Sequence, residues 1–189
     1  YDHGDKLKGG PPGSVDQDGD RFIEIWNLVF MQYEQVSKEK RINLPKPSVD
    51  TGMGLERMTA VLQGTHDNYN IDHFKKIIEA SSDIIKAPIN KSTIASHRVI
   101  SDHLRAIIFT ILDGQVPSNT GSGYVIRRIL RRATRYGYTN LDIHEPFLFK
   151  LVKNIADKYS DVYTDLITQQ KYIESLIKEK KKGFLNTLN

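Results

Sequence analysis

The chain has 189 residues, of which 39% are hydrophobic and 26% are charged, so it can bury a core in one large domain or two small ones. The composition is that of a soluble protein, because the longest apolar stretch, around residues 106–112, is far too short to span a bilayer, and no N-terminal segment is typical of a signal peptide. The absence of cysteine excludes disulfides and thiolate metal sites, and it is consistent with a reducing compartment.

Basic residues are concentrated in one segment of the chain. The net charge is only +4, from 27 basic and 23 acidic residues, but residues 121–137 contain five arginines and no acidic residue. Outside that segment the basic residues do not outnumber the acidic ones. A focal basic patch on a neutral chain indicates an anionic partner more strongly than a diffuse excess of charge would.

The N-terminal third of the chain is expected to contain a loop and part of a sheet. Residues 1–20 are rich in Gly, Asp and Pro, which is typical of a loop. Phe22–Tyr33 then combines β-branched and aromatic residues with few polar interruptions, which predicts a strand buried on both faces. Val36–Asn43 is polar and turn-like, and two prolines then lead an extended segment into Val49 and Asp50.

The stretch Asp50–Met58 carries the strongest functional signal. It places a carboxylate, two close glycines and Arg57 in the turn that opens an apolar helix, which should end near Gln63 with Gly64 as its left-handed stop. Glycines let the backbone approach a ligand, a helix N-terminus favours anions, and an arginine fork suits phosphate. The stretch has neither the third glycine of a dinucleotide fingerprint nor a Walker lysine. It predicts a site for a nucleotide beside a small ammonium compound, and the alternative is an ordinary glycine-rich helix start with exposed Glu56 and Arg57.

The remainder of the chain is expected to be helical. Apolar residues recur at helical spacing, and the predicted helices are Ile71–Ile85, Thr93–Leu112, the arginine-rich helix that follows a loop over residues 113–123, Pro146–Tyr159 and Asp161–Leu188. The predicted fold class is therefore α+β, with part of an antiparallel sheet in a domain over residues 1–66 and an all-helical domain over residues 67–189.

The arginine-rich helix has a readable geometry. Its predicted core stripe consists of Ile126, Ile129, Leu130, Ala133 and Tyr136. This leaves one flanking row of Arg127, Arg131 and Arg135, with Arg128 and Arg132 beside it. Rows at a one-turn spacing of ~6 Å suit a phosphate backbone. Because the helix contains no acid to pair with these arginines, RNA contact is favoured over surface ion pairs.

Four segments resemble the class II alanyl-tRNA synthetases and stand in the order of that family. They are Asp20–Tyr33, Leu44–Arg57, His97–Arg105 and Pro117–Ala133. The resemblance covers most of residues 1–137 and continues more loosely to the C-terminus. Several long matches in family order are more specific than any single motif. The resemblance implies a ligase that activates alanine with ATP and Mg²⁺ and transfers it to the acceptor stem of tRNA(Ala).

The resemblance also implies roles for individual residues. Asp50 occupies the position that binds the alanine ammonium group, with Gly52 beside it, although an N-cap of the following helix is the alternative for Asp50. Arg57 matches the arginine of the third class II motif, which holds the terminal phosphates of ATP, and Gly54 belongs to the same ATP site. Glu24 matches a catalytic position that binds Mg²⁺ and ATP.

Two readings are open for Asn27. Strict strand alternation would point Glu24 and Asn27 to opposite faces, so either a bulge reorients one of them, or only Glu24 reaches the metal. In the second reading, which we favour, Asn27 and Val29 line the alanine pocket, with Ile25 on the same face. Plain core packing is the alternative for Val29.

For RNA recognition, the resemblance assigns Asn119 to the residue that reads a G·U wobble pair, whereas the sequence around it also suits a simple turn residue. Ser122 stands where the family usually has an arginine, which removes one cation near the RNA. The five arginines are assigned to tRNA binding. His97 and His103 lack the spacing of a metal site and are expected to pack within their helix.

The resemblance further implies that the chain is a fragment. It would begin just past the second class II motif and lack the first motif, the editing domain with its zinc site and the C-terminal region. The isolated chain is then expected to be inactive, to contact the remainder of its own chain, and to be cytoplasmic, with an organellar form as the alternative. A non-catalytic RNA-binding module would not need Asp50, Gly52, Gly54 and Arg57. A synthetase-like paralogue, or a class II enzyme for another amino acid, fits the arginine helix less well.

Overall fold

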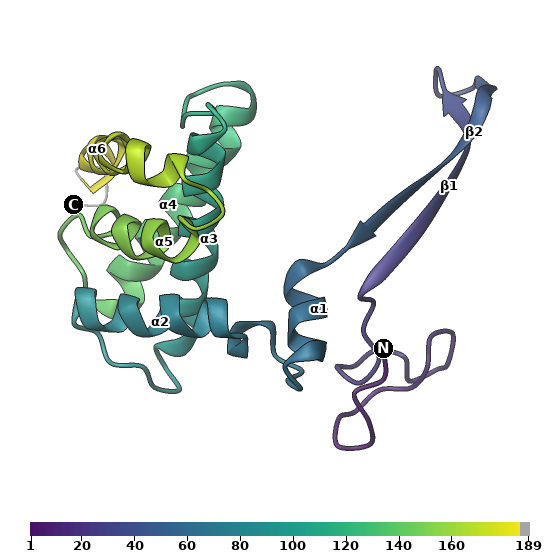
Figure 1. Cartoon of the computed structure of the whole chain (residues 1–189), viewed down its shortest axis with the longest axis horizontal. Helices are drawn as coiled ribbons and strands as arrows, with labels where there is room; N and C mark the ends of the chain where they lie inside the picture. The colour runs from purple at the N-terminus through teal and green to yellow at the C-terminus, as the bar shows by residue number, and fades with distance from the viewer. Residues whose placement is uncertain (186–189) are drawn as a thin grey trace. The chain divides into compact units, whose positions relative to one another are not determined.

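The computed structural model describes residues 1–185, and the chain divides into two compact units, Tyr1–Ile71 and Asp72–Asn189 (Figure 1). The first unit holds both strands, β1 and β2, and the short helix α1. The second holds helices α2 to α6. The predicted α+β class is therefore confirmed. Among the described helices, none is long and apolar enough to cross a membrane.

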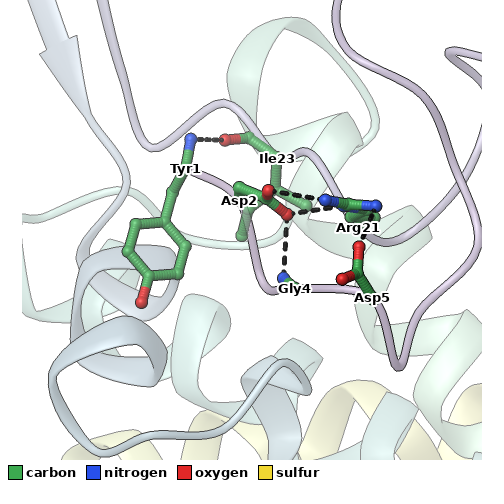
Figure 2. Close-up of polar contacts among 6 residues, drawn as sticks. All are labelled: Tyr1, Asp2, Gly4, Asp5, Arg21 and Ile23. Atoms are coloured by element: carbon green, nitrogen blue, oxygen red, sulfur yellow. Dashed lines mark hydrogen bonds and ion pairs between the residues drawn. The ribbon is translucent and has the colours of Figure 1, made fainter.

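The loop at the start of the first unit is closed by its own polar contacts. The backbone of Tyr1 pairs with that of Ile23, and Arg21 donates to Asp2 at 2.7 and 2.9 Å and pairs with Asp5 at 2.6 Å (Figure 2). The hydrogen bond from Arg21, together with the one from the Gly4 amide, lowers the pKa of Asp2 to about 2. These contacts hold the two ends of the predicted loop together, just ahead of β1.

The sheet is a two-stranded antiparallel ribbon of β1 (Trp26–Gln35) and β2 (Arg41–Met53) (Figure 1). Its register shifts between Met31 and Tyr33, opposite the stretch of β2 that contains both prolines. Proline cannot donate to a ladder, so a bulge is where it fits.

The prediction that this strand is buried on both faces is wrong for the described chain. Every residue of β1 is exposed, including Phe30 at 71%. β1 does carry the apolar side chains that led to the prediction, but a ribbon of two strands has no second layer to cover them. The strand also begins at Trp26 rather than at Phe22.

Helix α1 (Leu55–Leu62) follows β2 directly, with Gly54 as its N-cap. Gly64 ends it as predicted: its φ is +68°, its amide donates to Val61, and the Thr65 amide donates to Ala60. A short 3₁₀ turn, η1 (Asn68–Asn70), completes the unit. Asp50 therefore lies within β2 and is not the N-cap of α1.

The second unit contains α2 (Asp72–Ile85), α3 (Ile94–Leu112), α4 (Gly121–Leu141), the 3₁₀ turn η2 (Leu148–Leu151), α5 (Val152–Tyr159) and α6 (Asp165–Leu185). The bounds of α2 and α3 match the predicted helices to within one residue. The other bounds differ: α4 begins inside the predicted loop, the Pro146–Tyr159 segment begins as a 3₁₀ turn, and α6 begins at Asp165 rather than at Asp161. The last predicted residues of the final helix, 186–188, lie outside the described part of the chain.

The core of the second unit forms around α3. The α3 side chains at positions 100, 104, 107, 108 and 111 are at most 1% exposed, and they pack with residues of α4, α5 and α6. Their spacing is the helical stripe read from the sequence. At the far end of the α3–α4 pair, the Asn140 amide donates to Ser96 Oγ at 3.0 Å. The pair is antiparallel because only a short loop joins the two helices.

Helix α4 buries a stripe slightly different from the predicted one. Ile126, Leu130 and Ala133 are buried as expected, but Ile129 and Tyr136 are only partly buried. Gly137 takes part in their place, because a Cβ there would lie 2.4 Å from the ring of the buried Phe147. The buried face of α4 is thus rotated away from Ile129 and Tyr136, which widens the face that carries the arginines.

His97 is fully buried in α3, where its Nδ1 lies 2.7 Å from Ser81 Oγ of α2. Ser81 Oγ also lies 2.9 Å from the Ile78 carbonyl oxygen, to which it can donate. Burial lowers the pKa of His97 because it disfavours the charged imidazolium. His97 is thus a buried histidine with a partner at Nδ1, as expected for a structural residue, whereas its Nε2 has no hydrogen-bond partner within the described part of the chain.

The buried His97 should make the helical unit less stable in mild acid. Its folded-state pKa lies below the unfolded value of 6.5, so the stabilisation is complete above pH 6.5 and is lost as the pH falls toward the lowered folded value. We expect the urea midpoint, followed by far-ultraviolet circular dichroism, to fall between pH 7.5 and 5.5. We expect a smaller fall in His97→Gln. A control substitution of the exposed His144 by Gln should retain the wild-type fall, and an equal fall in His97→Gln would contradict this account.

Candidate functional site

Four predicted site residues share one face of the ribbon. Asn27 pairs with Gly52 and Val29 pairs with Asp50 across the two strands. Directly opposite residues of an antiparallel pair project to the same face, and so do residues two apart on one strand. A Cβ built on Gly52 would lie 3.4 Å from Asn27 Oδ1, which supports this arrangement. We call this set, Asn27, Val29, Asp50 and Gly52, the ribbon face.

The opposite face of the ribbon is distinct. There Trp26 Nε1 donates to Thr51 Oγ1, and the same hydroxyl donates to the Asn27 carbonyl at 3.0 Å. Strand alternation therefore separates a large aromatic side from a side with small and polar residues. The small side is the one that bears Asp50.

Glu24 and Arg57 lie at the end of the ribbon, near Asn27. Asn27 Nδ2 donates to Glu24 Oε1 at 3.2 Å, and Arg57 Nη1 donates to the Glu24 carbonyl oxygen at 2.6 Å. Because Glu24 precedes β1, strand alternation does not separate it from Asn27. The two side chains therefore contact each other without a bulge. Whether only Glu24 reaches a metal stays a prediction.

The Arg57 side chain lies against Gly54. A Cβ on Gly54 would lie 3.4 Å from Arg57 Cβ and Cδ, so the arginine side chain crosses the glycine. The Gly54 amide donates to the Ile25 carbonyl at 3.1 Å, which ties the start of α1 to the segment before β1. Glu24, Asn27, Gly54 and Arg57 are in this way brought into one contact network.

The ribbon face is small. Paired Cα atoms across an antiparallel ladder are ~5 Å apart, and residues two apart on a strand are ~7 Å apart. A patch of this size, with one carboxylate, one amide, one valine and a glycine, suits a compact ammonium compound. Asp50 Oδ1 accepts from the Thr51 amide at 2.8 Å, and the exposed carboxylate can still bind a cation through its other oxygen.

A divalent cation at Glu24 would depend on a ligand that brings its own oxygens. No group of three or more acidic, histidine or cysteine side chains able to hold a metal exists within residues 1–185. Mg²⁺ is commonly bound by one or two carboxylates together with substrate phosphates. Exposed Glu24, with one oxygen held by Asn27, fits that arrangement and not a closed protein cage.

The arginines of α4 line a hollow of about 1210 Å³. Its lining contains all five arginines, Tyr124, Tyr136 and Tyr138 of the same helix, and His103 of α3. Arg128 lies over the ring of Tyr124, and Arg132 over that of Tyr136, both at 5.9 Å. Guanidinium groups beside aromatic rings offer phosphate contacts and stacking surfaces on one helix.

An acidic residue of α3 lies close enough to Arg132 of this surface for their charges to interact. Asp102 of α3 accepts from His103 Nδ1 at 2.9 Å and lies 3.9 Å from Arg105 Nη2. The pKa of Asp102 is lowered, chiefly by the hydrogen bond from His103 and further by the charges of Arg105 and Arg132. Asp102 thus orients His103, whose ring lines the hollow.

The loop before α4 holds Asn119 next to these arginines. Ser118 makes the turn contacts: its amide donates to the Gly123 carbonyl at 3.0 Å and its hydroxyl to the Thr120 carbonyl at 2.8 Å. The Asn119 side chain takes no part in them and instead accepts a hydrogen bond from Arg127 Nη1. Ser122 donates to Gln115 at 2.6 Å, so the serine at this position fastens the loop.

Sequence reasoning missed Asp102, His103 and the tyrosines of this surface. The tyrosines could have been found, since Tyr124 and Tyr136 stand four residues from Arg128 and Arg132. Asp102 and His103 could not have been found from the sequence, because their position depends on how α3 packs against α4.

The chain was compared with known proteins. The family model described as tRNA synthetases class II (A) matches residues 1–189. Three curated relatives carry the name alanine–tRNA ligase: those of Rhizorhabdus wittichii, Sinorhizobium medicae and Rhizobium meliloti, at 54%, 53% and 52% identity over 188 residues. Each alignment covers 100% of this chain but 21% of the relative, so the chain spans about a fifth of their length.

Proposed function

The chain belongs to the class II (A) tRNA synthetases, and from this premise we propose that it is part of an alanine–tRNA ligase. The first unit contributes to the site that joins alanine to ATP, and the second unit binds the acceptor stem of tRNA(Ala). The observation that carries this proposal is that Asn27, Val29, Asp50 and Gly52 share one ribbon face while Glu24 and Arg57 meet at its end.

Asp50 binds the ammonium group of alanine. The carboxylate supplies a charge-assisted partner that fixes the amino acid, and Val29, paired with it across the strands, offers an apolar contact for the methyl group. Gly52 leaves room beside Asn27, whose amide can bind the substrate carboxylate. Binding of this kind orients the amino acid for attack on the α-phosphate of ATP.

Arg57 and Glu24 bind the nucleotide. The Arg57 side chain contacts the Glu24 carbonyl through one nitrogen, and in this proposal its other donors bind phosphate oxygens. When bound with ATP, Mg²⁺ neutralises phosphate charge, and Glu24 is the carboxylate that would hold it. The contact between Asn27 and Glu24 links the two substrates' sites.

The arginine-lined hollow of α4, together with Asn119 in the loop before it, binds the RNA. The arginines bind phosphates, which gives affinity without sequence information, and Asn119 reads a G·U pair from the loop. A non-catalytic RNA-binding module would use this surface alone and would have no need for the ribbon face. A cytoplasmic location remains a prediction from the resemblance.

Asp50→Asn in the full-length protein tests the alanine site. The amide keeps the shape of the carboxylate but loses the charge that pairs with the ammonium group. A hydrogen bond to a charged group is worth about 1.5–3 kcal/mol, so KM for alanine should rise on the order of 10- to 100-fold while KM for ATP changes little. Steady-state kinetics of alanine activation measure both.

Glu34→Gln is the matched control. It removes a carboxylate from β1 at the other end of the ribbon, opposite Ile42, and should leave both constants unchanged. If KM for alanine and kcat were the same in Asp50→Asn as in the wild type, Asp50 would not be the alanine-binding residue.

Replacing Arg128 and Arg135 by alanine tests the RNA surface. Each neutralised phosphate adds about 0.9 to the slope of log Kd against log salt, so the slope should fall by ~1 to 2. The full-length variant should bind a G·U stem and its G·C counterpart more weakly by the same factor. Filter binding at several salt concentrations measures both.

The control removes the same charge from another helix. Lys75→Ala with Lys76→Ala alters two exposed lysines of α2 and should leave the slope almost unchanged. A slope that fell equally in the lysine variant, or that did not fall in the arginine variant, would show that the α4 arginines are not the phosphate contacts.

A further inference from the structure

Arg127 differs from the other four arginines of α4. It is half-buried where the others are exposed, and it donates from Nη1 to the side-chain oxygen of Asn119, eight residues earlier. A cation used only for phosphate would be expected to project into solvent. The contact indicates that the Arg127 side chain has a role other than binding phosphate.

Helix geometry explains how Arg127 makes the contact. Side chains of a helix lean toward its N-terminus, and Arg127 stands within the first two turns of α4, so it reaches back to the loop that precedes the helix. Arg131 and Arg135 lie ~6 and ~12 Å further along the axis. They cannot reach Asn119.

The loop backbone is already held without Asn119. The Ser118 bonds to Gly123 and Thr120 fix its turn, and a Cβ on Gly123 would lie 2.3 Å from Ser118 Oγ, so loop and helix are in close contact. The exposed Asn119 side chain is the part left to rotate. Its hydrogen bond with Arg127 is what fixes it.

The donor also decides which way the amide faces. A guanidinium can only donate, so it binds the amide oxygen and leaves the NH₂ group of Asn119 directed elsewhere. An amide that rotated freely would present donor or acceptor alike and would discriminate poorly between base pairs. Fixing one orientation makes the side chain a defined probe of a groove edge.

We propose that Arg127 is a positioning residue for base recognition, acting through Asn119, and that the other α4 arginines supply phosphate affinity. The proposal rests on the function proposed above, in which Asn119 reads a G·U pair. It changes the roles of the arginine row: one member contributes to selectivity, while the rest contribute to affinity.

The test measures the ratio of Kd values for a G·C stem and its G·U counterpart with the full-length protein. A single base-pair preference of this kind is worth about 5- to 100-fold. Asn119→Ala should abolish most of this ratio. Arg127→Lys, which keeps the charge but loses the fork, should also lower the ratio, while the salt dependence and the affinity for the G·C stem stay within about two-fold.

Arg135→Lys is the matched control and should leave the ratio unchanged. The double variant Asn119→Ala with Arg127→Lys should have the ratio of Asn119→Ala alone, because Arg127 acts through the amide. A ratio that is unchanged in Arg127→Lys, or that falls further in the double variant, would overturn the proposal.

Crystal structures of the RNA-free variants separate this inference from the proposed function. The Asn119 side chain should turn away from its wild-type position in Arg127→Lys but not in Arg135→Lys. If it does turn and the wild type binds both stems equally, base reading by Asn119 fails while the contact stands. If it does not turn, Arg127 does not position Asn119 and the inference is wrong.

Discussion

The antiparallel register of β1 with β2 is the constraint on which the candidate alanine site depends. Because side chains alternate along a strand, a slip of one residue would turn Asp50 to the face that bears Trp26. The observed register instead pairs Val29 with Asp50 and Asn27 with Gly52. The same end of the ribbon brings Glu24 and Arg57 together, through contacts with Asn27 and with backbone. A short segment of sheet is thus sufficient to collect residues that are up to 33 positions apart.

The helical unit follows a similar logic. Packing of α4 on α3 buries Ile126, Leu130 and Ala133, and the helical period then leaves the arginines on the opposite side. The same packing brings His103 to the hollow and places Asp102 near Arg132. The surface is therefore not a bare row of cations. It also has aromatic rings, a histidine bonded to Asp102 and an amide held by a guanidinium.

The helices could be predicted from the sequence because each bears a stripe that repeats at the helical period, and the end of α1 because Gly64 permits a left-handed residue. The exposure of β1 could not be predicted from the sequence. Phe30 and its neighbours have the composition of a core strand whether or not another layer covers them. The contact between Glu24 and Asn27 was obscured by assuming that the strand begins at Phe22. Strand ends depend on pairing, which local sequence does not determine.

The roles of the individual site residues are predictions from the resemblance, and the geometry adds the contacts among these residues. Sequence alone gave Arg127 the same role as Arg131 and Arg135, because spacing along a helix does not tell which side chain reaches a loop. The position of Asp102 near Arg132 could not be predicted either, because it depends on the packing of two helices. Composition and periodicity predict elements and faces, whereas contacts between elements need the structure.

In the proposed function, the first unit belongs to an enzyme that activates alanine. Amino-acid-dependent exchange of pyrophosphate into ATP by the full-length protein, measured across a panel of amino acids, tests it most directly. Exchange is expected with alanine and its close analogues, at a rate that depends on Mg²⁺. Exchange with another amino acid and none with alanine would contradict it.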